Sequence, residues 1–244
     1  MGLLDGKVAV VTGAGAGLGR AYAQLLAREG AAVVVNDYAQ EPAEEVATAI
    51  REAGGAAVAS VADVGSVEGG ESILQDALSA FGHVDILVNN AGILRDKSLL
   101  KMGEADWDAV IRVHLKGTYC VTRAVFGQMK EAGRGGVIVN TTSTSGLRGK
   151  FGQTNYGAAK AGIWGFSNSL AQEGLKYGIR VWTIAPAAAS QLIDGDLMVS
   201  NHRCHGHYLA RTGDANGLMA EVMGRITGIC GGRGGSQQDR KSVV

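Results

Sequence analysis

The chain has 244 residues, of which 46% are hydrophobic and 19% are charged, enough to form the core of one large α/β domain. Basic and acidic residues balance at 23 each, so no net charge attracts nucleic acid or an anionic membrane. The sequence has no apolar run of about 18 residues, which a membrane span needs, and no secretory signal pattern at its start. Three cysteines without paired spacing predict a reduced compartment. We therefore expect a cytoplasmic protein with a small-molecule substrate and no nucleic-acid or membrane partner.

Short apolar runs alternate with longer helical patterns as far as Ile184. The expected strands are Val8–Val11, Val33–Asn36, Ala56–Ser60, Ile86–Asn89, Val137–Thr141 and Arg180–Ile184. The expected helices are Gly17–Glu29, Pro42–Ala53, Val67–Phe81, Glu104–Lys130 and Thr154–Tyr177, with stop signals at Gly30, Gly54, Gly82, Gly133 and Gly178. This alternation is typical of right-handed βαβ crossovers. It predicts a doubly wound parallel sheet, the Rossmann fold, in a single domain.

The pattern stops at about Ile193. Residues 194–244 are rich in glycine and show no convincing closing strand, which puts a seventh strand in doubt. We therefore separate a nucleotide-binding and catalytic domain, 1–193, from a glycine-rich tail, 194–244. The tail could be an altered reading frame, a truncated homologue or an unusual extension. Its crowded His202, Cys204, His205 and His207 match no familiar zinc spacing, and we expect no metal.

A glycine-rich turn joins the first strand to the first helix. It runs through Thr12–Gly19 and would bring helix N-terminal amides to a diphosphate. Gly13 permits the turn, Gly17 and the neighbouring Leu18 allow close approach of a ligand, and Gly19 allows tight helix packing. A bare packing turn is the alternative interpretation, but the place between strand and helix favours a nucleotide site.

Acidic and amide side chains follow the next strands. Asp37 closes the second strand, where a carboxylate can accept hydrogen bonds from the adenosine ribose and repel the 2′-phosphate of NADP, so the expected cofactor is NAD. A solvated turn residue is the alternative for Asp37, and Arg20 is the nearby cation that could instead hold a 2′-phosphate. The remaining expected lining residues are Asp63 and Val64 at the adenine, and Asn89, Ala91 and Gly92 at the nicotinamide ribose.

Three side chains form a candidate acid/base group. Tyr156 and Lys160 have i, i+4 spacing, so they share one helix face, and the ammonium is expected to lower the pKa of the phenol. Ser143, just past the fifth strand, can return its hydroxyl towards the same carbonyl oxygen. A Tyr-x-x-x-Lys motif alone is poor evidence, and a serine in such a stretch can simply bond its own backbone.

Together these motifs resemble the short-chain dehydrogenase/reductase family over about residues 5–190. The resemblance is carried by Thr12–Gly19, Asn89–Gly92 and Ser143 with Tyr156-x-x-x-Lys160. Further segments, including Gly92–Lys97 and Gly152–Tyr156, look like one branch of that family. This branch comprises the (3R)-hydroxyacyl-CoA dehydrogenase part of peroxisomal multifunctional enzymes and its bacterial relatives.

The resemblance implies hydride transfer between NAD and a secondary alcohol or ketone, above all a 3-hydroxyacyl-CoA, by a homodimer or homotetramer. It implies that Tyr156 exchanges the proton, Ser143 positions the oxygen, Lys160 supports the tyrosine and the ribose, and Pro186 contributes to the cofactor site. His114 stands where the family usually has an asparagine that holds a relay water. It could act in proton transfer, or it could be a hydrogen-bonded core histidine.

Two alternatives remain open from the sequence. The same chemistry could act on a steroid, a sugar alcohol or an acyl-carrier-protein thioester. The chain could instead be a nucleotide-binding protein with little turnover, because its tail lacks the expected substrate lid. The intact Ser143, Tyr156 and Lys160 favour the enzyme.

Overall fold

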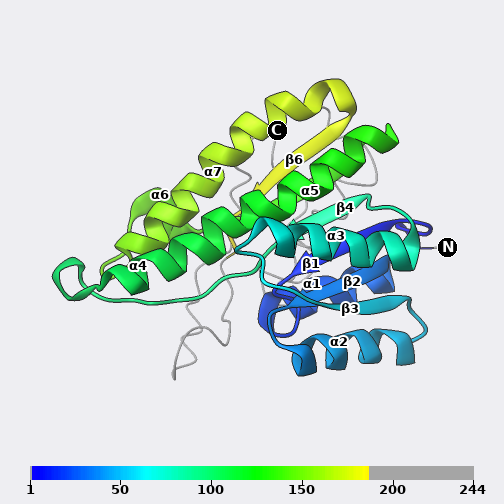
Figure 1. Ribbon diagram of the computed structural model, residues 1–244, viewed down its shortest axis with the longest axis horizontal. Coiled ribbons are helices and arrows are strands. Elements are labelled where there is room, and N and C mark those ends of the chain that lie inside the picture. Colours follow the sequence, from blue (N-terminus) through cyan, green and yellow to red (C-terminus); the bar gives the residue numbers. More distant parts are fainter. Residues whose placement is uncertain (1, 187–244) are drawn as a thin grey trace, which may run out of the picture.

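The computed structural model describes residues 2–186, and these form a six-stranded parallel sheet with helices on both faces (Figure 1). The strands are β1 Val8–Thr12, β2 Ala32–Asp37, β3 Ala57–Val61, β4 Ile86–Asn89, β5 Gly136–Thr141 and β6 Ile179–Ile184. Their order in the sheet is β3-β2-β1-β4-β5-β6. The predicted doubly wound parallel sheet is confirmed. The strand order reverses between β1 and β4, and such sheets bind ligands at this point, at the carboxyl ends of the strands.

Seven α-helices occur in the described part of the chain. They are α1 Gly17–Arg28, α2 Gln40–Glu52, α3 Val67–Phe81, α4 Glu104–Ile111, α5 Gly117–Ala132, α6 Thr144–Arg148 and α7 Thr154–Gly174. Short 3₁₀ turns cover Leu99–Lys101 and Leu175–Tyr177, and a π-helical turn covers Arg112–Lys116. All five glycines that were expected to end helices have positive φ angles.

Two apolar layers hold the helices to the sheet. On one face, α1 and α2 pack their buried side chains, such as Tyr22 and Val46, against Val33 and its neighbours. On the other face, Ile73 of α3, Val121 of α5 and Leu170 of α7 form the second layer. Each large side chain buried in this way stabilises the fold by roughly 1.5–3 kcal/mol. The layers fix the strand ends that carry the candidate site.

The structure differs from the sequence expectation in two places. The single helix expected over Glu104–Lys130 is interrupted by the π-helical turn Arg112–Lys116, and the short helix α6 was not predicted. The predictions about 194–244, including the missing seventh strand and the His202–His207 cluster, concern residues outside the described range. Within that range, no helix is long and apolar enough to cross a membrane.

Candidate active site

The glycine-rich turn brings backbone close to the end of β4. Gly13 has φ +61°, and a Cβ there would lie 2.7 Å from Ala91 Cα, so only glycine fits. A Cβ on Gly17, which has φ +54°, would meet nothing within 4 Å, so the turn is open to a ligand at this point. Ala16 caps α1 without a side-chain hydrogen bond, and the first turn of α1 contains no acidic residue. The amides there are therefore suited to an anionic group.

Asp37 is held against this turn. Its Oδ2 accepts a hydrogen bond from the Gly15 amide at 3.0 Å, and its Oδ1 accepts one from the Ala39 amide at 3.2 Å. Arg20, the cation considered for a 2′-phosphate, instead pairs with Glu45 of α2 at 2.9 Å. The carboxylate of Asp37 thus lies at the rim of the turn.

A cleft of about 620 Å³ runs along the carboxyl ends of β1 to β4. Eight of the expected cofactor residues line it: Gly13, Gly17, Leu18, Asp37, Asp63, Val64, Ala91 and Gly92. Asn90, within the expected segment Asn89–Gly92, lines it as well. Further lining residues were not expected at this site, among them Asn36, Tyr38, Ile93, Arg95, Ala109, Arg112 and Val113. Gly19 lies behind the turn, where a Cβ would collide with the Gly13 carbonyl oxygen. Pro186 follows β6 at the end of the described range.

Asp63 pairs across the cleft wall with Arg112, a residue that was missed from the sequence. Arg112 Nη1 and the Gly65 amide both donate to the Asp63 carboxylate. Burial alone would raise the pKa of Asp63, but these hydrogen bonds outweigh it and hold the pKa below its usual value. The pairing could not be foreseen, because 49 positions separate the two residues.

The side chain of the last residue of β4 lies in the core, whereas the residues that follow it lie at the cleft. Asn89 is 5% exposed, and its side chain points into the core, where Nδ2 donates to Thr122 and Asn140. Its side chain therefore does not line the cleft. Thr12 Oγ1 instead accepts hydrogen bonds from the amides of Asn90 and Ala91 at 3.0 and 3.1 Å, which fixes the backbone at the cleft edge.

Ser143, Tyr156 and Lys160 come together at the ends of β5 and α7. The Ser143 hydroxyl accepts a hydrogen bond from the Ser145 amide at 3.2 Å and lies close enough to the Tyr156 phenol to lower its pKa. Lys160 is 3% exposed, and its Nζ donates to the Thr141 carbonyl at 2.7 Å and lies 5.5 Å from the centre of the Tyr156 ring. Ser143 thus bonds the backbone, as its alternative interpretation held, and also faces the tyrosine.

The pKa values of this group differ from the expectation. Burial raises the pKa of Tyr156, and the Ser143 hydroxyl lowers it only in part. Lys160 is not among the causes of this shift, so the expectation that it lowers the phenol pKa was wrong. Burial lowers the pKa of Lys160 to about 7, so the ammonium loses much of its charge near neutral pH. Burial is the largest cause of both shifts.

His114 is buried in the π-helical turn beside Tyr156. Its Nε2 accepts a hydrogen bond from the Ile93 amide at 3.0 Å and lies 2.8 Å from the Ile93 carbonyl oxygen. The two rings of His114 and Tyr156 meet edge to face, 5.1 Å apart. Burial and the charge of Lys160 lower the pKa of His114 to about 3, so the imidazole is neutral. Nδ1 has no hydrogen-bond partner among the described residues.

A further set of contacts clamps the loop after β4 onto the start of α7. Gln153 Nε2 donates to Asp96 at 2.7 Å, and Asn155 Nδ2 donates to the Arg95 carbonyl at 3.1 Å. Asn155 also accepts the Tyr156 amide at 2.7 Å. The sequence analysis singled out both segments by resemblance, but spacing alone gave no sign that they touch.

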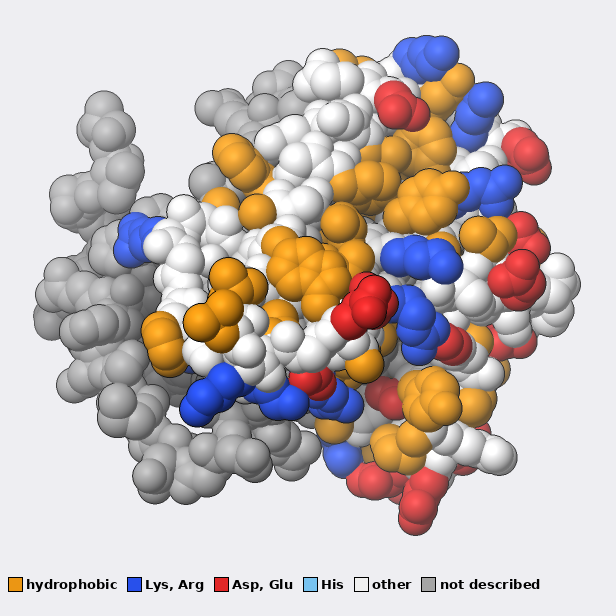
Figure 2. Space-filling model, turned by 60° about the vertical axis from the view of Figure 1, so that its left-hand side comes forward, with side chains coloured by type: hydrophobic (Ala, Val, Ile, Leu, Met, Phe, Trp, Pro, Cys, Tyr) orange, Lys and Arg blue, Asp and Glu red, His pale blue; other side chains and the backbone are white. Residues whose placement is uncertain are grey.

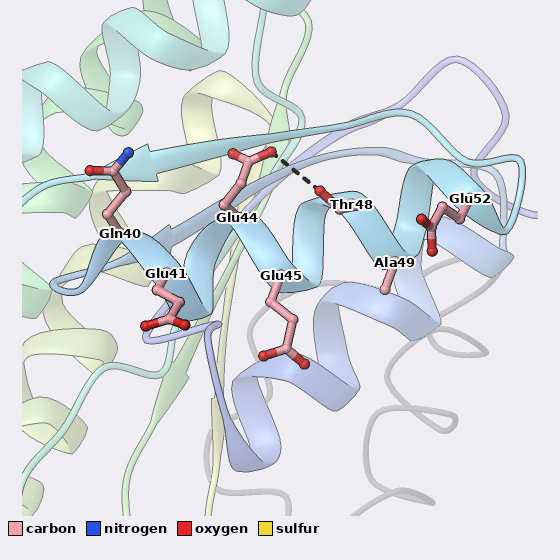
Figure 3. Close-up of a pocket in the computed structure, with 7 residues that line it drawn as sticks. All are labelled: Gln40, Glu41, Glu44, Glu45, Thr48, Ala49 and Glu52. Atoms are coloured by element: carbon pink, nitrogen blue, oxygen red, sulfur yellow. Dashed lines mark hydrogen bonds between the residues drawn. The ribbon is translucent and has the colours of Figure 1, made fainter.

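A second hollow runs along the outer face of α2 and contains none of the expected site residues. Its lining is acidic, with Glu41, Glu44, Glu45 and Glu52 along the helix (Figure 3). Glu44 accepts hydrogen bonds from Thr48 at 3.3 Å and from Arg51, and Glu45 pairs with Arg20. The candidate chemistry therefore belongs to the cleft at the strand ends.

The fold and the lining of the cleft are those of a dinucleotide-binding protein, and the family match makes it an oxidoreductase with a nicotinamide cofactor. The chain belongs to the short chain dehydrogenase family, which it matches over residues 7–196. It is 51% identical over 202 residues to peroxisomal multifunctional enzyme type 2 of Drosophila melanogaster, covering 79% of this chain and 33% of that protein. It is 45% identical over 201 residues to hydroxyacyl-CoA dehydrogenase ChsB1 of Mycobacterium tuberculosis, covering 78% of this chain and 63% of that protein. A short chain dehydrogenase from Mycobacterium avium has a similar structure, with a TM-score of 0.74 and 43% identity over 76% of this chain and 69% of that one.

Proposed function

We propose that this protein oxidises the 3-hydroxyl group of an acyl-CoA thioester with NAD as the hydride acceptor. The observation that carries the proposal is the meeting of Ser143, Tyr156 and Lys160 beside His114, whose partner Ile93 lines a dinucleotide-sized cleft. The similarity to a hydroxyacyl-CoA dehydrogenase supports the thioester. The chain spans a third of the first relative and under two thirds of the second, so their substrates are proposed here only for the shared part.

The residues around the cleft fit a dinucleotide. The uncapped first turn of α1 and the open side of Gly17 would receive the diphosphate. Asp63 and Val64 would lie at the adenine, and Ala91 and Gly92 at the nicotinamide ribose. The bound nicotinamide supplies a site that accepts a hydride from the alcohol carbon.

The choice of NAD over NADP rests on Asp37. Its carboxylate is fixed at the rim of the glycine turn, where it would bond the ribose hydroxyls and repel a phosphate. Arg20 pairs with Glu45 and so is already neutralised. Both features favour the unphosphorylated cofactor.

The side chains around the reacting oxygen have separate roles in the proposal. Tyr156 takes the hydroxyl proton, and Ser143 orients the oxygen through its hydroxyl. Lys160, with its pKa lowered to about 7, can hold or release a proton near neutral pH and would also bond the ribose. His114 holds the Ile93 backbone beside the tyrosine, and its unpartnered Nδ1 could hold a relay water.

The experiment is a test of NADH formation with a panel of substrates. The panel contains 3-hydroxyacyl-CoA thioesters of both configurations, a 3-hydroxyacyl thioester of acyl carrier protein, and secondary alcohols such as steroids and sugar alcohols. We expect turnover with a 3-hydroxyacyl-CoA at lower concentration than with any simple alcohol. Turnover confined to a steroid, a sugar alcohol or an acyl-carrier-protein thioester would reject the substrate. Cofactor binding without any turnover would reject the enzyme and favour the nucleotide-binding alternative.

The oligomeric state and the compartment stay predictions. Trp107, Tyr119 and Trp164 are 38%, 45% and 38% exposed on α4, α5 and α7, and such aromatic side chains suit an interface of the proposed homodimer or homotetramer. Figure 2 shows apolar side chains gathered among charged ones on the face where α4 and α6 come forward. Cys120 is the one cysteine within residues 2–186 and is buried, so the described part of the chain does not test the predicted reduced compartment.

A further inference from the structure

A chain of buried polar side chains crosses the sheet beneath α5 and α7. Asn89 Nδ2, at the end of β4, donates to Thr122 Oγ1 and to Asn140 Oδ1, both at 2.8 Å. Asn140 Nδ2, on β5, donates to Ser167 Oγ of α7 at 2.8 Å. Ser167 Oγ in turn donates to the Ile163 carbonyl at 2.7 Å. We call Thr122, Asn89, Asn140 and Ser167 the polar chain.

The side chains of the polar chain are buried, and each hydrogen bond fixes the position of one partner relative to the other. Asn140 is fully buried, and Asn89, Thr122 and Ser167 are 5%, 1% and 2% exposed. Asn89 and Asn140 are direct partners in the parallel ladder, so their side chains stand on the same face of the sheet. Leaving one such group unpaired costs about 1–3 kcal/mol, and this cost adds to the packing that is lost when a helix slides over the sheet. The polar chain therefore selects one position of α7 on the sheet.

Three residues of the polar chain are close along their strands or helix to residues of the cleft and of the catalytic group. Asn89 precedes Ala91, which lines the cleft. Asn140 precedes Thr141, whose carbonyl accepts Lys160 Nζ. Ser167 lies two turns beyond Lys160, on the same side of α7. A shift of α7 along β5 would thus move Lys160 and Tyr156 relative to both the carbonyl and the cleft.

We propose that Asn140 and Ser167 are positioning residues for the reaction, holding α7 at the height where Tyr156 and Lys160 meet Ser143 and the cofactor cleft. The proposal rests on the proposed function for its turnover assay, but not for its geometry. The apolar side chains around it, such as Ile138 and Leu170, supply stability. The polar chain fixes the position of α7 relative to β5.

The first test compares Ser167→Thr with Ser167→Val. The two side chains have the same shape, so any crowding is common to both, and they differ only in the hydroxyl that bonds Asn140 and Ile163. We expect kcat of the valine variant to be about tenfold below that of the threonine variant, because small displacements of reacting groups are costly. We also expect KM to change less than kcat and the acid limb of the pH profile to move. Equal kcat values and pH profiles in the two folded variants would overturn the proposal.

The second test covers the strand side of the polar chain. Asn140→Leu keeps the side-chain size but removes both hydrogen bonds, and Ile138→Val, two residues away on the same face, is the control for loss of packing. We expect Asn140→Leu to weaken NADH binding by about threefold or more relative to Ile138→Val, measured by NADH fluorescence. Equal affinities at matched unfolding midpoints would overturn the proposal.

The two tests separate this inference from the proposed function. If the parent protein fails to oxidise any 3-hydroxyacyl-CoA, the proposed function fails. The serine comparison then uses whichever secondary alcohol the parent oxidises, and the NADH titration decides alone if it oxidises none. The inference fails only when the matched variants behave alike.

Discussion

The ammonium nitrogen of Lys160 lies 5.5 Å from the centre of the Tyr156 ring. Burial nevertheless raises the pKa of Tyr156 and lowers the pKa of Lys160, so it favours the neutral form of both side chains. Lys160 is anchored to the Thr141 carbonyl rather than to the phenol oxygen. A hydrogen bond from bound substrate or ribose would add a partner for the charged forms, so ligand binding is expected to activate the pair.

Tyr156→Phe is the direct test of the acid/base role. The ring still packs against His114, but the exchangeable proton is gone. We expect kcat to fall by about 10²-fold or more, with NADH affinity nearly unchanged. Single-turnover kinetics and an NADH titration measure the two quantities. Turnover within a few-fold of the parent would refute the role.

Asp37 is expected to set the preference for NAD. Asp37→Ser removes the charge and the contact to the Gly15 amide, and we expect NAD affinity to fall by about tenfold while NADP affinity rises. Asp37→Asn is the matched control, because it keeps an acceptor oxygen and removes only the charge. Titrations with both cofactors give the ratio. A parent protein that binds NAD and NADP equally well would contradict the prediction.

Lys160 gives the stability of the protein a definite dependence on pH. Its folded pKa is about 7, below the value of 10.5 in an unfolded chain, so the unfolded state binds the proton more tightly. Stability is therefore gained as pH rises from about 7 towards 10.5. Between pH 7 and pH 9 the gain is at most about 3 kcal/mol relative to Lys160→Met. Urea unfolding at several pH values measures it, and Lys150→Met, at an exposed site, should follow the parent.

His114 is expected to affect the stability of the protein at acid pH. Its folded pKa of about 3 lies below 6.5, so the protein loses stability as pH falls below 6.5, by at most about 3 kcal/mol at pH 4.5. His114→Asn should lack this loss.

Turnover separates the two interpretations of His114. If His114 serves a proton relay, His114→Asn should retain most turnover, and His114→Leu should lose it while still binding NADH. Equal turnover in both folded variants would support the core-histidine interpretation.

The fold was largely predictable because parallel strands buried on both faces, such as Ile86–Asn89, stand out as apolar runs between turn signals. The glycine turn and the Tyr156 and Lys160 pair were found because each is local: a strand-to-helix junction and one helix turn.

The parts that were missed depend on contacts between distant segments. Asp63 meets Arg112, and Asp96 meets Gln153, only because strand ends and helix starts converge at one edge of the sheet. Asn89 was assigned to the ribose site by its position after β4, but the alternation of a strand turns its side chain into the core. Spacing also gave no measure of burial, which reverses the expected pKa shift of Tyr156.

The π-helical turn Arg112–Lys116 takes up one residue more than a regular helix would at this point. Figure 1 shows α4 and α5 as one long rod, but α4 packs on α7 and α5 packs on α3. A π turn accommodates about one more residue than an α turn over the same rotation, so Val121 and Val125 beyond it still face the core. Removal of one residue here would close the turn into a regular α-helical turn and leave the faces of α4 and α5 in place. What such a deletion would change is the local backbone that holds His114 against Ile93. The cost of a one-residue deletion at this point of the rod therefore falls on the site rather than on the core.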